Sequence, residues 1–114
     1  MSKLSDLKVN LRLSVYNSNA ESKSVFGKGI ADLCKGVRET GSLNAAAKRM
    51  GMAYSKAWRI IKETENALGI DLLIRDGAHG STLTEDADRL LDAYYSITDE
   101  LLKEAAELYK EKTE

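Results

Sequence analysis

The stretch that most constrains the fold runs from residue 41 to residue 69, where a three-residue turn, 51–53, separates two helical patterns. Before the turn, small and apolar residues recur at i, i+3, i+4 and i+7, which is the spacing of one helix face. Ser42 precedes this face as an N-cap, and Gly51 follows it where a left-handed residue commonly ends a helix. Two short helices joined by a glycine-containing turn are typical of the helix-turn-helix. The first apolar face is Leu43, Ala46, Ala47 and Met50, and the second is Ala57, Ile60, Ile61, Thr64 and Leu68.

The opposite face of the second helix is polar and basic. Between residues 44 and 62 there are five cations and no acid, a formal charge of +5. Such a helix can enter the major groove of DNA, although an ordinary helical hairpin with a solvated basic face has the same pattern. The outward positions are Ser55, Arg59, Lys62 and Asn66, and the five cations are Lys48, Arg49, Lys56, Arg59 and Lys62.

The segment after the second helix favours DNA binding. Residues 70–75 are β-prone, residues 76–80 form a glycine-rich turn, and residues 81–83 can return as a second strand. A two-stranded hairpin directly after a helix-turn-helix is a wing. We expect Arg75 and His79 near its tip, close to a DNA backbone or minor groove.

The last third of the chain predicts one long helix. Thr84 can cap it, and no glycine or proline interrupts residues 85–114, so it could run for about 28 residues, or roughly 42 Å. It carries two apolar stripes, and a small domain can cover only one. We therefore expect the second stripe to contact a partner chain. The first stripe is Leu91, Tyr94, Thr98, Leu101, Ala105 and Leu108, and the second is Tyr95, Leu102, Ala106 and Tyr109. The residues expected to dimerise are Leu91, Tyr94, Tyr95, Leu101, Leu102, Leu108 and Tyr109.

The N-terminal quarter predicts a small hairpin followed by a helix. Residues 8–16 alternate apolar and polar side chains, and residues 24–26 could return as a partner strand. A helical pattern then ends at Thr40, with Gly41 in the position for a left-handed cap. Cys34 belongs to the apolar face of this helix, so a buried inert thiol is expected.

Composition limits the other possibilities. A chain of 114 residues that is 43% hydrophobic and 31% charged is one globular domain. It has no apolar run of the ~18 residues that a membrane span needs, and its N-terminus lacks the apolar core of a signal peptide. We therefore expect a cytoplasmic protein without a membrane partner. The net charge of −1 is unusual for a DNA-binding protein, but residues 1–83 carry +5 and residues 84–114 carry −6.

Several short motifs occur together: FGKG at 26–29, ETGSL at 39–43, AAA at 45–47, MGM at 50–52, YSKAW at 54–58, ALG at 67–69 and LT at 83–84. In this combination the chain resembles the N-terminal winged-helix domain of ModE-type molybdate-responsive transcription regulators. It resembles the LysR-type DNA-binding domain more distantly. The resemblance implies DNA contact from Tyr54, Ser55, Lys56 and Arg59, at the start of the family's recognition helix, with Trp58 a further candidate.

The chain departs from the ModE-type pattern in three ways. Ala53 stands where the family usually has serine, so the recognition helix lacks its expected capping oxygen. The wing is shorter, and the 114 residues do not include the family's molybdate-binding domains. We therefore expect DNA binding and dimerisation, but no molybdate binding.

The candidate DNA-binding residues differ in their expected roles. Arg59 is the best candidate for reading guanine, because its guanidinium can donate two hydrogen bonds to one base. Ser55 and Tyr54 suit phosphate, which sets register without reading sequence. Partial core packing suits Trp58 slightly better than DNA contact. The full set is Ser42, Lys48, Arg49, Tyr54, Ser55, Lys56, Arg59, Lys62, Arg75 and His79.

Enzymatic functions fit the sequence poorly. It has no glycine-rich phosphate loop between a strand and a helix, and His79 has no neighbouring metal ligands. We expect no catalytic activity, metal or cofactor.

The sequence thus predicts a mainly α fold with a small β component. It is a winged helix-turn-helix with a β-hairpin at 8–26, the helix-turn-helix and wing at 28–84, and a dimerisation helix at 85–114. The predicted function is a homodimeric regulator of transcription that binds double-stranded DNA. The alternative is a protein-interaction module whose last helix docks another regulator, and a basic surface broken by Glu63, Glu65 and Asp76 would favour it.

Overall fold

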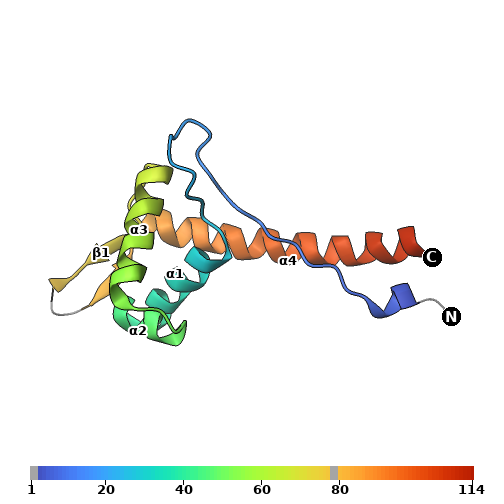
Figure 1. Cartoon of the computed structure of the whole chain (residues 1–114), viewed down its shortest axis with the longest axis horizontal. Helices are drawn as coiled ribbons and strands as arrows, with labels where there is room; N and C mark the ends of the chain where they lie inside the picture. The colour runs from blue at the N-terminus through green and yellow to red at the C-terminus, as the bar shows by residue number, and fades with distance from the viewer. Residues whose placement is uncertain (1–2, 78–79) are drawn as a thin grey trace.

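Three short helices and a two-stranded sheet gather around one end of a long helix (Figure 1). The computed structural model describes residues 3–77 and 80–114. This confirms the predicted mainly helical fold with a wing after the helix-turn-helix. The helices are α1 (Lys28–Thr40), α2 (Leu43–Arg49), α3 (Tyr54–Leu68) and α4 (Glu85–Thr113), the strands are β1 (Leu73–Arg75) and β2 (Ser81–Leu83), and a 3-10 helix, η1 (Lys3–Asp6), precedes them.

The molecule has three parts. The head comprises residues 13–95, the stem is α4 from residue 96 to residue 113, and the arm is residues 3–12. In Figure 1 the stem projects from the head, and the arm runs beside it, with η1 near the C-terminal end of α4. None of the described helices combines the length and apolar character that a membrane span requires.

The predicted caps form at the start of α2 and at the ends of α1 and α2. The Ser42 hydroxyl accepts a hydrogen bond from the Ala45 N–H (3.2 Å) at the start of α2. Gly41 and Gly51 both take positive φ, 74° and 65°, at the ends of α1 and α2. Ala53 precedes α3 and provides no side-chain cap, as its missing hydroxyl predicts.

The core lies where α1, α2 and α3 pack on the wing and the first half of α4. Cys34 is fully buried, and this burial raises the pKa of its thiol to about 12, which fits the expected inert cysteine. Gly36 permits the closest helix contact, because a Cβ there would lie 2.7 Å from the Ala46 Cβ. The largest fully buried side chains include Phe26, Leu33, Leu43, Ile61, Leu72 and Leu91.

The wing is fixed to the turn between α1 and α2. Strands β1 and β2 pair antiparallel, and the Ser81 N–H donates to the Gly41 carbonyl (2.9 Å). A Cβ at Gly80 would collide with that carbonyl, and Gly80 also has a φ of 105°. The wing is therefore held against the same turn that begins the helix-turn-helix.

The predicted N-terminal hairpin at 8–26 is wrong. Within the described residues, this segment contributes a single bridge, in which Val15 and Phe26 exchange hydrogen bonds of 2.9 and 2.8 Å. The returning segment 17–24 is polar and has no run of β-prone residues, so the ladder cannot extend. Leu13 and Val15 still pack on the core. Residues before them leave the head and follow α4 (Figure 1).

Helix α4 uses its apolar stripes differently from the prediction. Leu91 and Tyr94 were expected to dimerise, but both are buried in the core of the head, where Tyr94 packs edge-on against Phe26. The second stripe is partly covered by this same chain. The Tyr95 hydroxyl donates to Asp32 (2.8 Å), and the Tyr109 hydroxyl donates to the Leu4 carbonyl (2.8 Å).

The apolar surface left open on α4 belongs to the stem. Ile97, Leu101 and Leu108 are 40%, 42% and 43% exposed. Their spacing places them on one face of the helix. The exposed apolar residues of α4 therefore belong to the C-terminal half of the first stripe, together with Ile97. The C-terminal part of the second stripe faces the arm.

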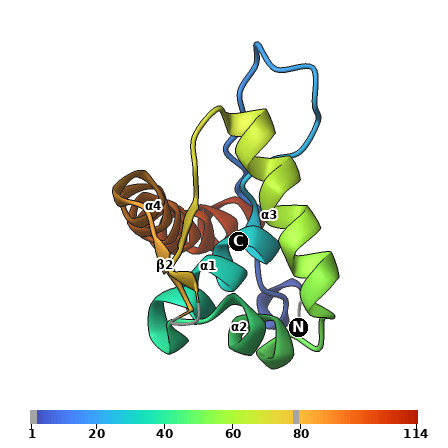
Figure 2. The ribbon, with the colours of Figure 1, turned by 90° about the vertical axis from the view of Figure 1, so that its left-hand side faces the viewer.

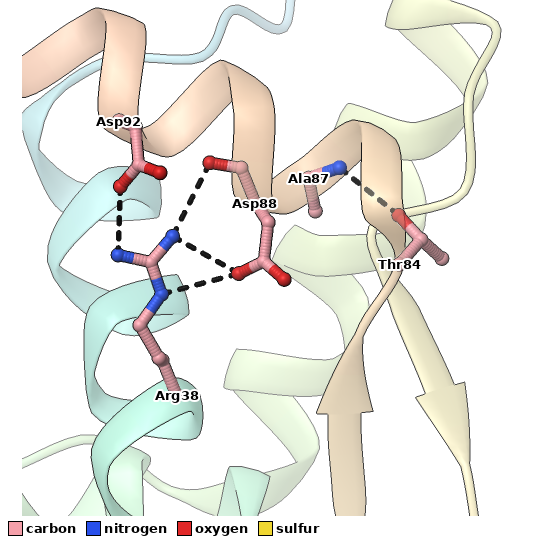
Figure 3. Close-up of polar contacts among 5 residues, drawn as sticks. All are labelled: Arg38, Thr84, Ala87, Asp88 and Asp92. Atoms are coloured by element: carbon pink, nitrogen blue, oxygen red, sulfur yellow. Dashed lines mark hydrogen bonds and ion pairs between the residues drawn. The ribbon is translucent and has the colours of Figure 1, made fainter.

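A forked ion pair joins α1 to α4 at the base of the head (Figure 3). The Arg38 guanidinium donates to the Asp88 carboxylate through Nε and Nη2 (3.1 and 2.9 Å) and to Asp92 through Nη1 (2.9 Å). The same end of α4 is capped by Thr84, whose hydroxyl accepts from the Ala87 N–H (3.0 Å). These contacts join α1 to the first half of α4 and cap the start of that helix.

Candidate nucleic-acid interface

Helix α3 presents the predicted outer face to solvent. Ala57, Ile61 and Thr64 point inward and are buried. In the end-on view of Figure 2, α1 lies between α3 and α4, so α3 has a face directed away from the long helix. The side chains on that outer face are exposed, as predicted: Ser55, Arg59, Lys62 and Asn66.

The cations around this face differ in how strongly acids hold them. Arg49 is paired with Glu39 at 2.8 Å, whereas the Arg59 Nε lies 3.9 Å from Glu63, with both side chains more than half exposed. Lys48 and Lys56 have no ion pair within the described part of the chain. A pair as long and exposed as Arg59–Glu63 contributes little, so Arg59 can exchange it for another anion.

Glu65 has a role that the sequence analysis missed. Its side chain is 7% exposed, and Oε2 accepts hydrogen bonds from the N–H groups of Leu72 (2.7 Å) and Leu73 (3.3 Å). Glu65 follows Ile61 by four residues, so helical periodicity placed it on the inner face. The buried Glu65 fixes the start of the wing, and its Oε1 lies 3.4 Å from the Lys62 Nζ of the basic surface.

Arg75 is not directed to the wing tip. It is the last residue of β1, and its Nη2 donates to the Tyr54 hydroxyl (3.2 Å) at the start of α3. Its Cζ lies 4.8 Å from the centre of the Trp58 ring. Arg75 therefore joins the basic face of α3. His79, the other residue expected at the tip, lies outside the described residues.

Trp58 combines the two roles that were weighed for it. The ring is half-buried and packs against the core. Its exposed side also lies beneath two cations, because the Lys62 Nζ is 4.7 Å from the ring centre, as close as Arg75. Both distances are within the range of cation–π attraction.

A shallow hollow of about 340 Å³ lies where the two helix starts meet the wing. The Ser42 hydroxyl faces it but already caps α2, so Ser42 would contact a ligand only beside that hydrogen bond. Arg75 and Tyr54 supply donors whose chemistry suits an anionic oxygen. Within the described residues, no cluster of carboxylates, cysteines and histidines could hold a metal. The lining residues are Ser42, Leu43, Asn44, Tyr54, Arg75, Gly77, Gly80 and Ser81.

Sequence comparison identifies a known motif in the same region. Residues 33–88 match the family described as "Bacterial regulatory helix-turn-helix protein, lysR family". This range begins inside α1, contains the whole helix-turn-helix and wing, and ends in the first turn of α4. Residues 33–88 of the chain are therefore similar to a LysR-type helix-turn-helix. Comparison with curated protein sequences finds no significant match.

Solved structures share the fold. The structure titled "Crystal structure of CbnR_DBD-DNA complex" is 26% identical, has a TM-score of 0.58, and covers 74% of this chain and 94% of that one. "Crystal structure of VV2_1132, a LysR family transcriptional regulator" is 24% identical with a TM-score of 0.53. That match covers 62% of this chain but only 24% of the VV2_1132 chain, so the likeness is to one part of a longer protein. These matches confirm the winged helix-turn-helix fold.

Proposed function

We propose that this chain, whose residues 33–88 are similar to a LysR-type helix-turn-helix, binds specific sequences of double-stranded DNA and regulates transcription as a homodimer. The observation that carries the proposal is the outer face of α3, where Ser55, Arg59 and Lys62 are exposed on a helix-turn-helix. The matched structure named CbnR_DBD is a complex with DNA, which supports the same use of this fold here. Burial of Glu65 supports it further, because this carboxylate is not an exposed acid on the basic face.

Arg59 and Lys62 have different tasks in this proposal. Arg59 lies one turn after Ser55, near the helix start, where side chains of a recognition helix reach base edges. Lys62 lies about one turn further along, where the helix approaches the DNA backbone, and its ammonium acts as a point charge. Lys48, Arg49 and Lys56 add phosphate contacts around this helix.

The proposed homodimer forms through the stem. Ile97, Leu101 and Leu108 form an exposed aliphatic face that the head and the arm leave uncovered. A second copy would bury this face and place two recognition helices on a two-fold-related DNA site. The proposal also includes a ModE-like use of the YSKAW motif at 54–58, without binding of molybdate by these 114 residues.

The exposed stem also supports a second candidate, in which α4 docks another regulator and the basic face is incidental. Glu63 and Asp76 are exposed acids beside the basic face and favour this candidate. The two candidates differ in DNA binding, because only the first requires α3 to bind duplex.

The test compares Arg59→Ala with Lys62→Ala on a duplex that the wild-type protein selects from a random library. Arg59→Ala should lower affinity for that duplex and flatten the preference at one base position in each half-site, a loss of ~1–3 kcal/mol of discrimination. Lys62→Ala should lower the affinity for selected and scrambled duplexes alike. It should also reduce the salt slope, the change of log affinity with log salt concentration, by roughly one.

Lys103→Ala is the matched control, because Lys103 is an exposed cation on the stem, far from α3. It should leave affinity, base preference and salt slope unchanged. If Arg59→Ala keeps the wild-type base preference, Arg59 does not read bases. Failure of the wild type to select any duplex would favour the docking candidate.

A further inference from the structure

We propose that Trp58 is a positioning residue for DNA binding: its ring holds Lys62 of the recognition helix and Arg75 of the wing in place for DNA phosphates. The inference rests on the proposed DNA-binding function and assigns a role to a side chain that need not touch DNA. It is carried by the arrangement of one aromatic ring, two cations and two anchoring groups.

The two cations reach the ring from different elements. The Lys62 Nζ, one helical turn after Trp58 in α3, lies 4.7 Å from the ring centre, and the Arg75 Cζ, in β1, lies 4.8 Å from it. Cations at this distance from an indole are attracted to its π face. Because the two positive groups repel each other, the shared ring offsets part of the cost of keeping them close.

Each cation is also held at a second point. The Arg75 Nη2 donates to the Tyr54 hydroxyl at 3.2 Å, which orients the guanidinium along the start of α3. The Lys62 Nζ lies 3.4 Å from Oε1 of the buried Glu65, whose other oxygen accepts from the Leu72 and Leu73 N–H groups. The wing and the residue before it are therefore bonded to α3 at two points, Tyr54 and Glu65, one before and one after Trp58 in the sequence.

The second contacts leave both cations available to an anion. Lys62 keeps 55% of its side chain exposed, and Arg75 is also exposed. Tyr54 and Arg75 face the hollow between the helix starts and the wing. Holding these long side chains before DNA arrives lowers the conformational entropy lost on binding. The wing and the recognition helix then approach the DNA backbone as one unit.

The arrangement can first be tested without DNA, because Trp58 is the single tryptophan of the chain and its fluorescence reports on this site alone. Removing Arg75 uncovers one side of the ring. Arg75→Ala should therefore increase the quenching of Trp58 by acrylamide, while Lys103→Ala should not. Equal quenching in the wild type and in Arg75→Ala would overturn the stacking arrangement.

The second test measures duplex affinity as a function of salt for Trp58→Leu, Trp58→Phe and Arg75→Ala. Trp58→Leu should lower the affinity for selected and scrambled duplexes several-fold. It should also lower the salt slope by about one, because a cation loses its position over a phosphate. Trp58→Phe keeps an aromatic face, so it should retain most of the wild-type affinity and most of the wild-type salt slope. The double variant Trp58→Leu/Arg75→Ala should lose less than the two single changes combined.

The outcomes separate this inference from the proposed function. Additive losses, or a Trp58→Leu salt slope equal to that of the wild type, would overturn the positioning role while DNA binding stands. A wild-type protein that binds no duplex would overturn the proposed function and with it the role of Trp58 on DNA.

Discussion

The head and the stem differ in how far they bury their apolar residues. In the head, helices and wing cover each other, and both Leu91 and Tyr94 of α4 are buried there. In the stem, the same helix continues, but Leu101 and Leu108 stay about two-fifths exposed. The comparison shows that an apolar stripe on a helix does not identify its own partner: one half of this stripe builds the core, and the other half stays exposed.

The largest expected effect is the difference in stability between one substitution in the head and one in the stem. Leu91→Ala should lower the free energy of unfolding by about 3 kcal/mol, because it leaves a cavity in a closed core. Leu101→Ala should change it by less than about 0.5 kcal/mol, because its side chain is already half in water. Urea unfolding of dilute protein, followed by circular dichroism, measures both. Equal losses would mean that the stem is as tightly packed as the head.

The closest helix contact of the head should resist any added side chain. Gly36→Val should lower the free energy of unfolding by about 2 kcal/mol, because its Cβ would lie 2.7 Å from the Ala46 Cβ. Gly29, in the same helix, has no atom within 4 Å of an added Cβ. Gly29→Ala should therefore be neutral or stabilising by up to about 1 kcal/mol. A neutral Gly36→Val would show that α1 and α2 can separate at little cost.

The joint between α1 and the first half of α4, within the head, should depend on Arg38. Its fork to Asp88 and Asp92 is partly exposed, so Arg38→Ala should lower the free energy of unfolding by about 1 kcal/mol. Arg89 has no ion pair within the described part of the chain, and Arg89→Ala serves as the control. The same unfolding measurement in high salt should reduce the difference between the two variants. Equal stability of both variants would mean that the fork does not hold the joint.

The smallest expected effect is acid sensitivity at the same joint. Burial alone would raise the pKa of Asp32, but hydrogen bonds from Lys28 and Tyr95 outweigh it and hold the pKa below its ordinary value. A lowered folded pKa adds stability above the ordinary value of about 3.9, and this stability is lost as the pH falls through the folded pKa.

Asp32→Asn should therefore reduce the dependence of the unfolding midpoint on pH in the acid range, below about pH 5. Asp99→Asn, which changes an exposed carboxylate of the stem, should not. An unchanged acid dependence in Asp32→Asn would show that this carboxylate does not hold the joint.

The helices and the wing could be predicted from the sequence because their signals are local. Helical spacing, the caps Ser42 and Thr84, and the glycines at 41 and 51 lie within a few residues of what they determine. The predicted hairpin at 8–26 was wrong because the path of this segment depends on contacts that are not local. Its alternation correctly placed Leu13 and Val15 toward the core, but the return segment had no matching apolar residues, and no local pattern indicated that the arm would follow α4.

The site was predictable only in part. The outer face of α3 followed from periodicity, whereas the contacts that tie the wing to α3 join residues distant in sequence. Arg75 is 21 residues from Tyr54, and Glu65 binds the amide groups seven and eight residues later. Such contacts depend on how the wing packs, which no local pattern encodes. The basic charge of this region could be counted from the sequence, but the orientation of the cations could not.

The head buries a core of its own, whereas the stem leaves an aliphatic face exposed, which the proposed second copy would cover. Sedimentation velocity at micromolar concentration tests this difference with Leu101→Glu and with Ser96→Glu, which adds the same charge at an exposed position outside the aliphatic face of α4. Wild type and Ser96→Glu should sediment with about twice the chain mass of 12.6 kDa. Leu101→Glu should sediment as a single chain while keeping its helical circular dichroism and its unfolding transition. A wild-type protein that stays a single chain at the highest concentration reached would contradict the proposed role of the stem.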